Sequence, residues 1–181
     1  MEQIGLKIIL ALLKHKELHV RGIAKSLNEP HANISRAMKR LLNRNTVDFK
    51  IEGKNKLFRL KKGVEALSYV YMAEHFKLLT LFERYPFLSV MAESILQKTG
   101  EKLIIIFGSF AKFNAKADSD IDIFVETENR KLKAEIEKIN SRLSVKIGKL
   151  DKDNLLVKEI IKDHVIVKGV EYFYGKNRIF D

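Results

Sequence analysis

The chain has 181 residues, of which 46% are hydrophobic and 31% charged, and it contains no cysteine. This length accommodates one ordinary domain or two small ones, and the composition is typical of globular rather than disordered proteins. The lack of cysteine excludes disulfides, cysteine catalysis and thiolate metal sites, and five scattered histidines argue against a zinc site.

The net charge of +11 is unevenly distributed. Residues 1–62 carry 15 Lys and Arg against 5 Asp and Glu, whereas residues 63–181 carry 19 against 18. A basic segment of this kind either forms a solvated surface or binds a polyanion. The sequence predicts no membrane span, because no stretch of about 18 uninterrupted apolar residues occurs. The N-terminus lacks the basic start and cleavage site of a signal peptide, which leaves the cytoplasm as the expected location.

Hydrophobic periodicity predicts three helices in the first third of the chain. A stripe of Ile and Leu begins at Ile4, and "VRGIAKSL" forms a shorter second helix. Pro30 separates it from a third helix in "ANISRAMKRLLNRN", because proline cannot continue the preceding helix. The apolar face of the third helix is Ile34, Ala37 or Met38, and Leu41, and its polar face is Asn33, Ser35, Arg36, Lys39 and Arg40.

A hairpin is predicted after the third helix. Val47, Phe49 and Ile51 alternate with polar residues, "EGKN" supplies a turn, and "LFRL" forms the returning strand. Lys54 and Lys56 lie at the tip.

Three helices followed by a basic hairpin resemble the winged helix-turn-helix family of DNA-binding domains, over residues 3–62. The resemblance implies that the third helix enters the major groove of duplex DNA and presents Asn, Ser and Arg side chains to base edges. It also implies that Lys54 and Lys56 lie against phosphates. The alternative is a protein–protein interaction module whose basic face is only solvated.

The middle of the chain predicts two helices, at residues 64–84 and 87–98, interrupted near Pro86 and stopped by Gly100. Five aromatic residues could stack on bases, but their Leu, Val and Met neighbours favour core or interface packing; they are Tyr69, Tyr71, Phe76, Phe82 and Tyr85. An apolar helix face that stays exposed would instead serve dimerisation, so a homodimer remains open.

The first candidate functional residues follow the apolar run "KLIIIF". This run predicts a buried strand, and Gly108 allows a sharp turn and the close approach of a ligand. The next residues, "FAKFN", predict a helical turn whose free amides, with the Ser109 hydroxyl, could hold phosphate.

The chain then returns in a second strand, "SDIDIFVE". Asp120 and Asp122 share one face of this strand, roughly 6–7 Å apart, because side chains alternate between faces. Ile121, Ile123 and Val125 take the buried face. Two carboxylates held this close repel each other, and a divalent cation such as Mg²⁺ would neutralise them. The alternative is an acidic strand edge that blocks aggregation, which leaves the Gly-Ser turn unexplained.

G-S-x-A, a spacer and S-D-I-D before an apolar run resemble the nucleotidyltransferase superfamily of DNA polymerase β, and within it the minimal nucleotidyltransferases, over residues 90–170. The motif residues are Gly108, Ser109, Ala111, Ser119, Asp120 and Asp122. The resemblance implies transfer of a nucleoside monophosphate from a Mg²⁺-bound nucleoside triphosphate to a hydroxyl. It implies nucleotide binding by Gly108, Ser109 and Lys112, and catalysis and Mg²⁺ binding by Asp120 and Asp122.

The chain departs from the family pattern in two places. Phe113 and Asn114 stand where relatives usually carry glycine. The family's third carboxylate is not evident on the next strand, "SVKIGKL", because Lys146 occupies the expected position. Asp151 lies beyond the strand end and could substitute only if the strand is placed differently. Without that carboxylate, metal binding could persist while activation of the attacking hydroxyl fails. The competing hypothesis is a non-enzymatic regulator whose domain binds nucleotide or metal, or only dimerises.

The remaining sequence predicts a helix from about residue 154 to 162 and a strand in "HVIVKG". The expected fold class is therefore α+β. It comprises an N-terminal winged helix domain at residues 1–62, a helical connector at 63–89 and a small mixed-sheet nucleotidyltransferase-like domain at 90–181.

Overall fold

The structure is a computed structural model that describes residues 3–177. These residues divide into two compact units, 3–76 and 77–177, and the boundary falls inside the helix α4 (Val64–Arg84). The predicted bounds of this helix are confirmed. The three-part division, with a separate connector at 63–89, stays a prediction. No helix in the described part of the chain is long and apolar enough to cross a membrane.

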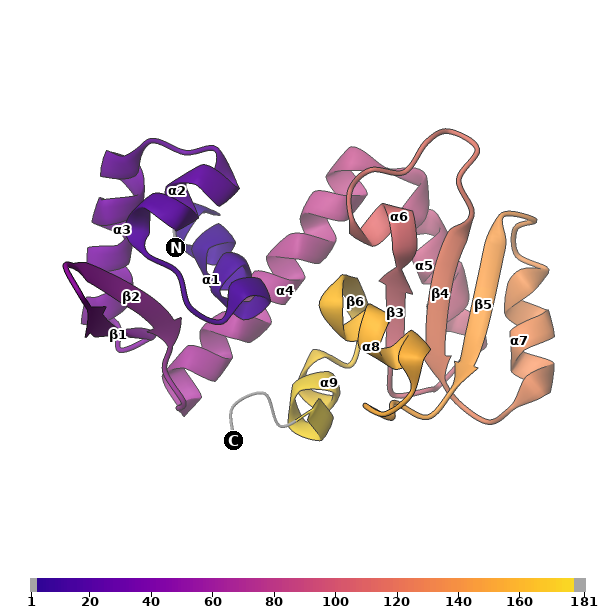
Figure 1. Ribbon diagram of the computed structural model, residues 1–181. Coiled ribbons are helices and arrows are strands. Elements are labelled where there is room, and N and C mark those ends of the chain that lie inside the picture. Colours follow the sequence, from indigo (N-terminus) through magenta and orange to yellow (C-terminus); the bar gives the residue numbers. More distant parts are fainter. Residues whose placement is uncertain (1–2, 178–181) are drawn as a thin grey trace. The chain divides into compact units, whose positions relative to one another are not determined.

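The first unit consists of three helices, a hairpin and the first part of α4. The helices are α1 (Gln3–His15), α2 (Val20–Leu27) and α3 (His31–Asn43), and the hairpin is β1 (Val47–Glu52) and β2 (Asn55–Leu60) (Figure 1). The strands pair antiparallel with Phe49 opposite Phe58. Leu18, between α1 and α2, exchanges two backbone hydrogen bonds with Phe58. The segment before α2 is therefore attached to β2 of the hairpin by this isolated bridge.

Local sequence explains where these helices stop and start. The α2 N-cap is His19, whose Nδ1 accepts a hydrogen bond from the backbone amide of Gly22 at 2.9 Å. Asn28 ends α2 in the left-handed conformation, which asparagine tolerates, and Pro30 follows as the N-cap of α3. The expected apolar face of α3 is buried, including both Ala37 and Met38.

The second unit is built on a four-stranded sheet in the order β5-β4-β3-β6. Its strands are β3 (Ile104–Phe107), β4 (Ile121–Glu126), β5 (Leu143–Gly148) and β6 (His164–Lys168). Strand β3 runs antiparallel to β4 and β6, whereas β4 and β5 are parallel. The expected mixed sheet is thus present, with α7 (Arg130–Glu137) in the crossover between the parallel strands (Figure 1).

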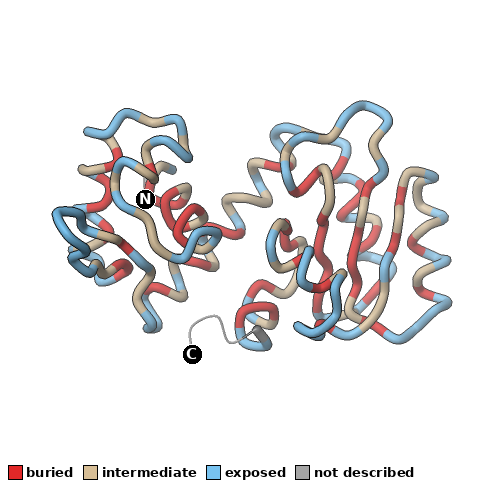
Figure 2. Tube along the Cα trace, viewed as in Figure 1, coloured by how far each residue is buried: buried red, intermediate tan, exposed pale blue. Residues whose placement is uncertain are grey.

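One face of this sheet carries the main core of the unit. Ile121, Ile123 and Val125 lie on it, as expected from the alternation in the sequence. They pack with residues of α5 (Phe87–Lys98), of α7 and of the last turns of α4. Red strands in Figure 2 show how completely the centre of the sheet is buried.

The other face is partly covered by α8 (Leu155–Lys162) and α9 (Val170–Asn177) (Figure 1). The ring of Phe173 in α9 lies 4.6 Å from that of His164, which is paired with Phe107 across the sheet. Phe124 also lies on this face and is buried. Asp122, two residues earlier on β4, is only half-buried. The candidate site therefore lies at the end of this face where the helical cover stops.

Candidate functional site

The turn after β3 is shaped around glycine. Gly108 begins the short helix α6 (Gly108–Ala111) directly after the strand, with φ of +69°. A Cβ at this position would lie 2.3 Å from Oδ2 of Asp122, which is far inside van der Waals contact. The predicted helical turn, in "FAKFN", thus begins two residues earlier than expected. Ser109 and Lys112 follow at the second position and the C-cap of α6, half-buried and exposed respectively.

Phe113 explains the first departure from the family pattern. Its φ is +58°, the left-handed conformation that favours glycine. The backbone amide of Phe113 donates to the Phe110 carbonyl at 2.9 Å, and its side chain packs against the core of the unit. Left-handed backbone costs a residue with a side chain roughly 1–2 kcal/mol, and the partial burial of the Phe113 ring offsets some of this cost. At this turn, packing of the Phe113 side chain therefore compensates in part for the conformational freedom that a glycine would have.

The two aspartates are not equivalent. Asp122 is the second residue of β4, pairs with Phe107 and is half-buried, whereas Asp120 is exposed and precedes the strand by one residue. The expected strand from residue 119 thus starts at Ile121. Charge from Asp120 still acts on Asp122 and raises its pKa, so the two carboxylates are electrostatically coupled.

The parallel neighbour β5 supplies the other groups around Asp122. Ser144 pairs with Asp122 across the ladder, and Lys146 pairs with Phe124 on the same face. The Ser144 side chain hydrogen-bonds the Asp122 carboxylate. The alternation of β5 indicated that Ser144 and Lys146 share a face, but the partner of Asp122 depends on the register between β4 and β5, which the sequence does not display.

Burial dominates the electrostatics of Asp122. Desolvation raises its pKa above the ordinary value, and the repulsion from Asp120 adds to this. The Ser144 hydrogen bond and the positive charge of Lys146 act in the opposite direction but do not cancel the shift. Lys146 therefore lies close enough to Asp122 to compensate part of its charge.

The donor set fits a metal ion that arrives with a nucleotide better than one held by the protein alone. Among residues 3–177, no group of three or more His, Cys, Asp or Glu side chains could hold a metal ion. Asp120 and Asp122 supply two carboxylates. Mg²⁺ at phosphate-transfer sites is commonly bound by one or two carboxylates with the remaining positions filled by phosphates and water.

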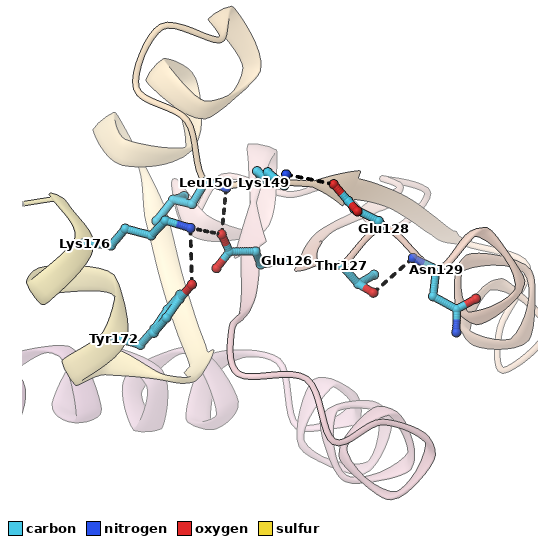
Figure 3. A network of polar contacts seen from close by, with 8 residues as sticks. All are labelled: Glu126, Thr127, Glu128, Asn129, Lys149, Leu150, Tyr172 and Lys176. Atoms are coloured by element: carbon cyan, nitrogen blue, oxygen red, sulfur yellow. Dashed lines mark hydrogen bonds and ion pairs between the residues drawn. The ribbon is translucent and has the colours of Figure 1, made fainter.

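A second carboxylate on the β4 face serves a different purpose. Glu126 accepts hydrogen bonds from the Lys176 ammonium and from the backbone amide of Leu150, and Lys176 also donates to the Tyr172 hydroxyl at 3.2 Å (Figure 3). Burial raises the pKa of Glu126, but these hydrogen bonds outweigh it and leave the pKa below its ordinary value. Glu126 therefore ties β4 to α9 and to the segment after β5.

The basic residues expected to bind DNA lie in the first unit. Arg36, Lys39 and Arg40 are exposed on α3, while Asn33 and Ser35 are half-buried. The Arg36 guanidinium donates to Oδ1 of Asn33 at 2.7 Å. At the hairpin tip Lys54 is exposed, and the Lys56 ammonium lies 4.2 Å from the centre of the Phe49 ring.

Acidic residues of the hairpin region are paired with other cations. Glu17 contacts Lys50 at 2.6 Å and Arg59 at 4.0 Å, and Asp48 also lies 4.0 Å from Arg59. The charges of Lys50 and Arg59 are thereby partly offset.

Comparison with known protein families gives a match that lies within the second unit. Residues 92–171 match the family model described as polymerase beta, nucleotidyltransferase. The match includes the Gly-Ser turn, both aspartates, and Ser144 and Lys146. It supports a nucleotidyltransferase domain of the polymerase β-like superfamily in this part of the chain, and it suggests nucleotidyl transfer as the reaction class. Searches of curated proteins and of solved structures gave no match.

Proposed function

We propose that the nucleotidyltransferase domain binds a nucleoside triphosphate with Mg²⁺ and transfers its nucleoside monophosphate to a hydroxyl acceptor. The observation that carries this proposal is the contact between Gly108 and Asp122, which sets a strand carboxylate directly against the Gly-Ser turn. A turn that leaves no room for a side chain, next to a half-buried carboxylate, suits a phosphate-bound cation. The family match over residues 92–171 supports the same reaction class.

Each residue of the proposed site has a distinct role. Asp120 and Asp122 would ligate Mg²⁺, while Gly108, Ser109 and Lys112 would contact the phosphates. The Ser144 side chain holds Asp122 in place. When bound, Mg²⁺ would neutralise charge on the phosphates during displacement. Because two carboxylates make an incomplete coordination shell, we expect weak Mg²⁺ binding without nucleotide.

Lys146 favours a second candidate function. A protonated lysine beside Asp122 cannot ligate a metal ion or accept a proton from an attacking hydroxyl. Its charge also competes with the cation for the carboxylates. The second candidate is therefore a regulator whose domain binds nucleotide but transfers it slowly or not at all.

Nucleotide binding is tested with two aspartate variants of equal charge change. Asp122→Asn removes a proposed ligand, whereas Asp118→Asn removes an exposed carboxylate outside the proposed set. Calorimetry with ATP, GTP, CTP and UTP in the presence of Mn²⁺ should show affinity lost in the first variant and kept in the second. Equal affinity in both variants would refute the site. Incubation of wild type with Mg²⁺ and α-labelled nucleotides, with pyrophosphate release as the readout, then separates the enzyme from the regulator.

For the first unit we propose a winged helix that binds duplex DNA. Support comes from the three helices and hairpin, from the bridge between Leu18 and Phe58, and from the exposed cations of α3. In this arrangement α3 would enter the major groove, and Lys54 and Lys56 would lie near phosphates. A protein-interaction module is the alternative use of the same fold.

DNA binding is tested by two double variants that lower the net charge by the same amount. Arg36→Ala with Arg40→Ala should weaken duplex binding clearly, whereas Lys131→Ala with Lys138→Ala, two exposed lysines of the other unit, should leave it unchanged. Each lost phosphate contact should flatten the log–log salt slope by about 0.9. A wild-type chain that binds no duplex even at low salt would favour the interaction module.

A further inference from the structure

We infer that Arg142 is a positioning residue for the Asp120 carboxylate. The inference rests on the proposed nucleotide-binding function of the second unit. It concerns a residue outside the Gly-Ser and Asp-x-Asp motifs, located in the connection that leads from α7 into β5.

Arg142 contacts the chain on both sides of Asp120. Its Nε and Nη2 donate to the carbonyl oxygen of Ser119 at 3.1 and 2.7 Å. Its own carbonyl oxygen accepts the backbone amide of Ile121 at 2.8 Å. One residue therefore holds the peptide groups before and after Asp120, although Asp120 itself lies outside the sheet.

The Arg142 guanidinium also packs against two aromatic rings. It lies 5.4 Å from the centre of the Phe87 ring and 5.9 Å from that of Phe110, which is buried. The backbone amide of Arg142 also donates to Oδ1 of Asn140 at 2.9 Å. A planar cation packed against two aromatic rings loses little further freedom when it binds a carbonyl.

The loop that precedes Asp120 is closed by two hydrogen bonds between Lys116 and Ser119. The Ser119 hydroxyl accepts the Lys116 amide at 2.8 Å, and the Ser119 amide donates to the Lys116 carbonyl at 3.2 Å. This turn is compact but is joined to the unit through the Ser119 carbonyl bound by Arg142. Without that bond, Asp120 would follow the loop and not the strand, and its carboxylate would not stay beside Asp122.

Arg142→Gln and Arg142→Lys test the inference, with Arg130→Gln as a control on an exposed arginine of the same domain. Hydrogen exchange of the amides of Lys116 and Ser119 is measured in the free protein. Loss of a charged hydrogen bond should speed their exchange by about tenfold in Arg142→Gln, less in Arg142→Lys, and not in the control. Unchanged exchange in Arg142→Gln overturns the inference.

The second readout is the affinity for ATP with Mn²⁺, measured by calorimetry together with the melting temperature. We expect affinity to fall by about tenfold in Arg142→Gln, with partial recovery in Arg142→Lys. Faster exchange with full nucleotide affinity would reduce Arg142 to a structural residue and overturn its role in the site. If wild type binds no nucleotide, the proposed function fails, and exchange alone decides whether Arg142 fixes the backbone at Asp120.

Discussion

The Asp122 carboxylate fills the space in which a side chain at Gly108 would begin. An ideal Cβ at residue 108 would lie 2.3 Å from Oδ2 and 3.2 Å from Cγ of Asp122. The residues belong to neighbouring strand ends, since Phe107 pairs with Asp122. A side chain at position 108 would therefore require the Asp122 carboxylate to move.

A double-mutant cycle measures this dependence. Gly108→Ala should lose roughly 1–3 kcal/mol of unfolding free energy, from left-handed backbone and from displacement of Asp122. In an Asp122→Ala background only the backbone cost remains, so the penalty of Gly108→Ala should shrink by about 1 kcal/mol. Urea unfolding of the four proteins gives the coupling energy. Additive effects would show that the carboxylate moves aside freely.

The stability of the free protein should rise when Asp122 is neutralised. Burial raises the pKa of Asp122 above its ordinary value of 3.8, so the folded state holds the proton more tightly than the unfolded state. The contribution of Asp122 to stability is then fully present below the unfolded pKa and is lost as the pH rises through the folded pKa. Asp122→Asn should raise the melting temperature at pH 7, and the difference should disappear in strong acid.

The control for this pH series is Asp118→Asn, because Asp118 is exposed. Its melting temperature should follow that of wild type across the same range. A stabilising effect of Asp122→Asn that persisted at the lowest pH would point to packing and not to charge.

Reversing the charge of Lys146 should strengthen cation binding. Lys146→Asp removes a positive charge that acts on Asp122 and adds a carboxylate on the same strand face. We expect Mn²⁺ affinity in the presence of nucleotide to rise by at least about tenfold. Loss of the ammonium and gain of a carboxylate should each contribute about 1 kcal/mol or more between neighbouring charges. Lys138→Asp, at the exposed C-cap of the crossover helix α7, is the matched control. Equal affinities in the two variants would remove Lys146 from the site.

The Glu126–Lys176 pair should stabilise the unit more than an exposed pair does. Lys176→Met leaves Glu126 without its main donor and should cost about 1–3 kcal/mol of unfolding free energy. Lys149→Met breaks the ion pair with Glu128, whose side chains are both 75% exposed, and should cost at most about 0.5 kcal/mol. Chemical denaturation compares the two variants.

Acid should reduce the deficit of Lys176→Met. Hydrogen bonds hold the pKa of Glu126 below its ordinary value of 4.5 despite burial, so the stability from this carboxylate exists above that value and is lost as the pH falls through the folded pKa. A deficit that stayed constant down to the lowest pH at which the protein folds would show that Lys176 acts through its methylenes.

Sequence patterns predicted those parts of the fold that depend on neighbours along the chain. Pro86 and Gly100 mark the limits of α5 (Phe87–Lys98), and alternation assigned Ile121, Ile123 and Val125 to the buried face. Gly108 was predicted to allow a sharp turn after the strand, and its φ is positive. In each case the signal is local and steric.

The parts that remained hidden depend on tertiary contacts. Phe124 shares the face of Asp122 and is buried there, which requires knowing how the C-terminal helices cover the sheet. The contact of Ser144 with Asp122 requires the β4–β5 register. Phe113 adopts a left-handed conformation, which a phenylalanine in the sequence does not predict. Its packing against the core offsets part of the strain. Arg142 carries no motif and acts through a backbone carbonyl.

Strand β4 carries two carboxylates on one face, Asp122 as its second residue and Glu126 four residues later. At about 3.3 Å per residue they are roughly 13 Å apart. The charges that act on the pKa of Asp122 are those of Asp120 and Lys146, whereas the charge of Lys176 acts on Glu126. Buried Phe124 separates them along the same face. The two ionisations consequently depend on different neighbours, so the contact of Glu126 with the C-terminal helix can be strengthened or weakened without changing the groups that set the charge of the aspartate pair.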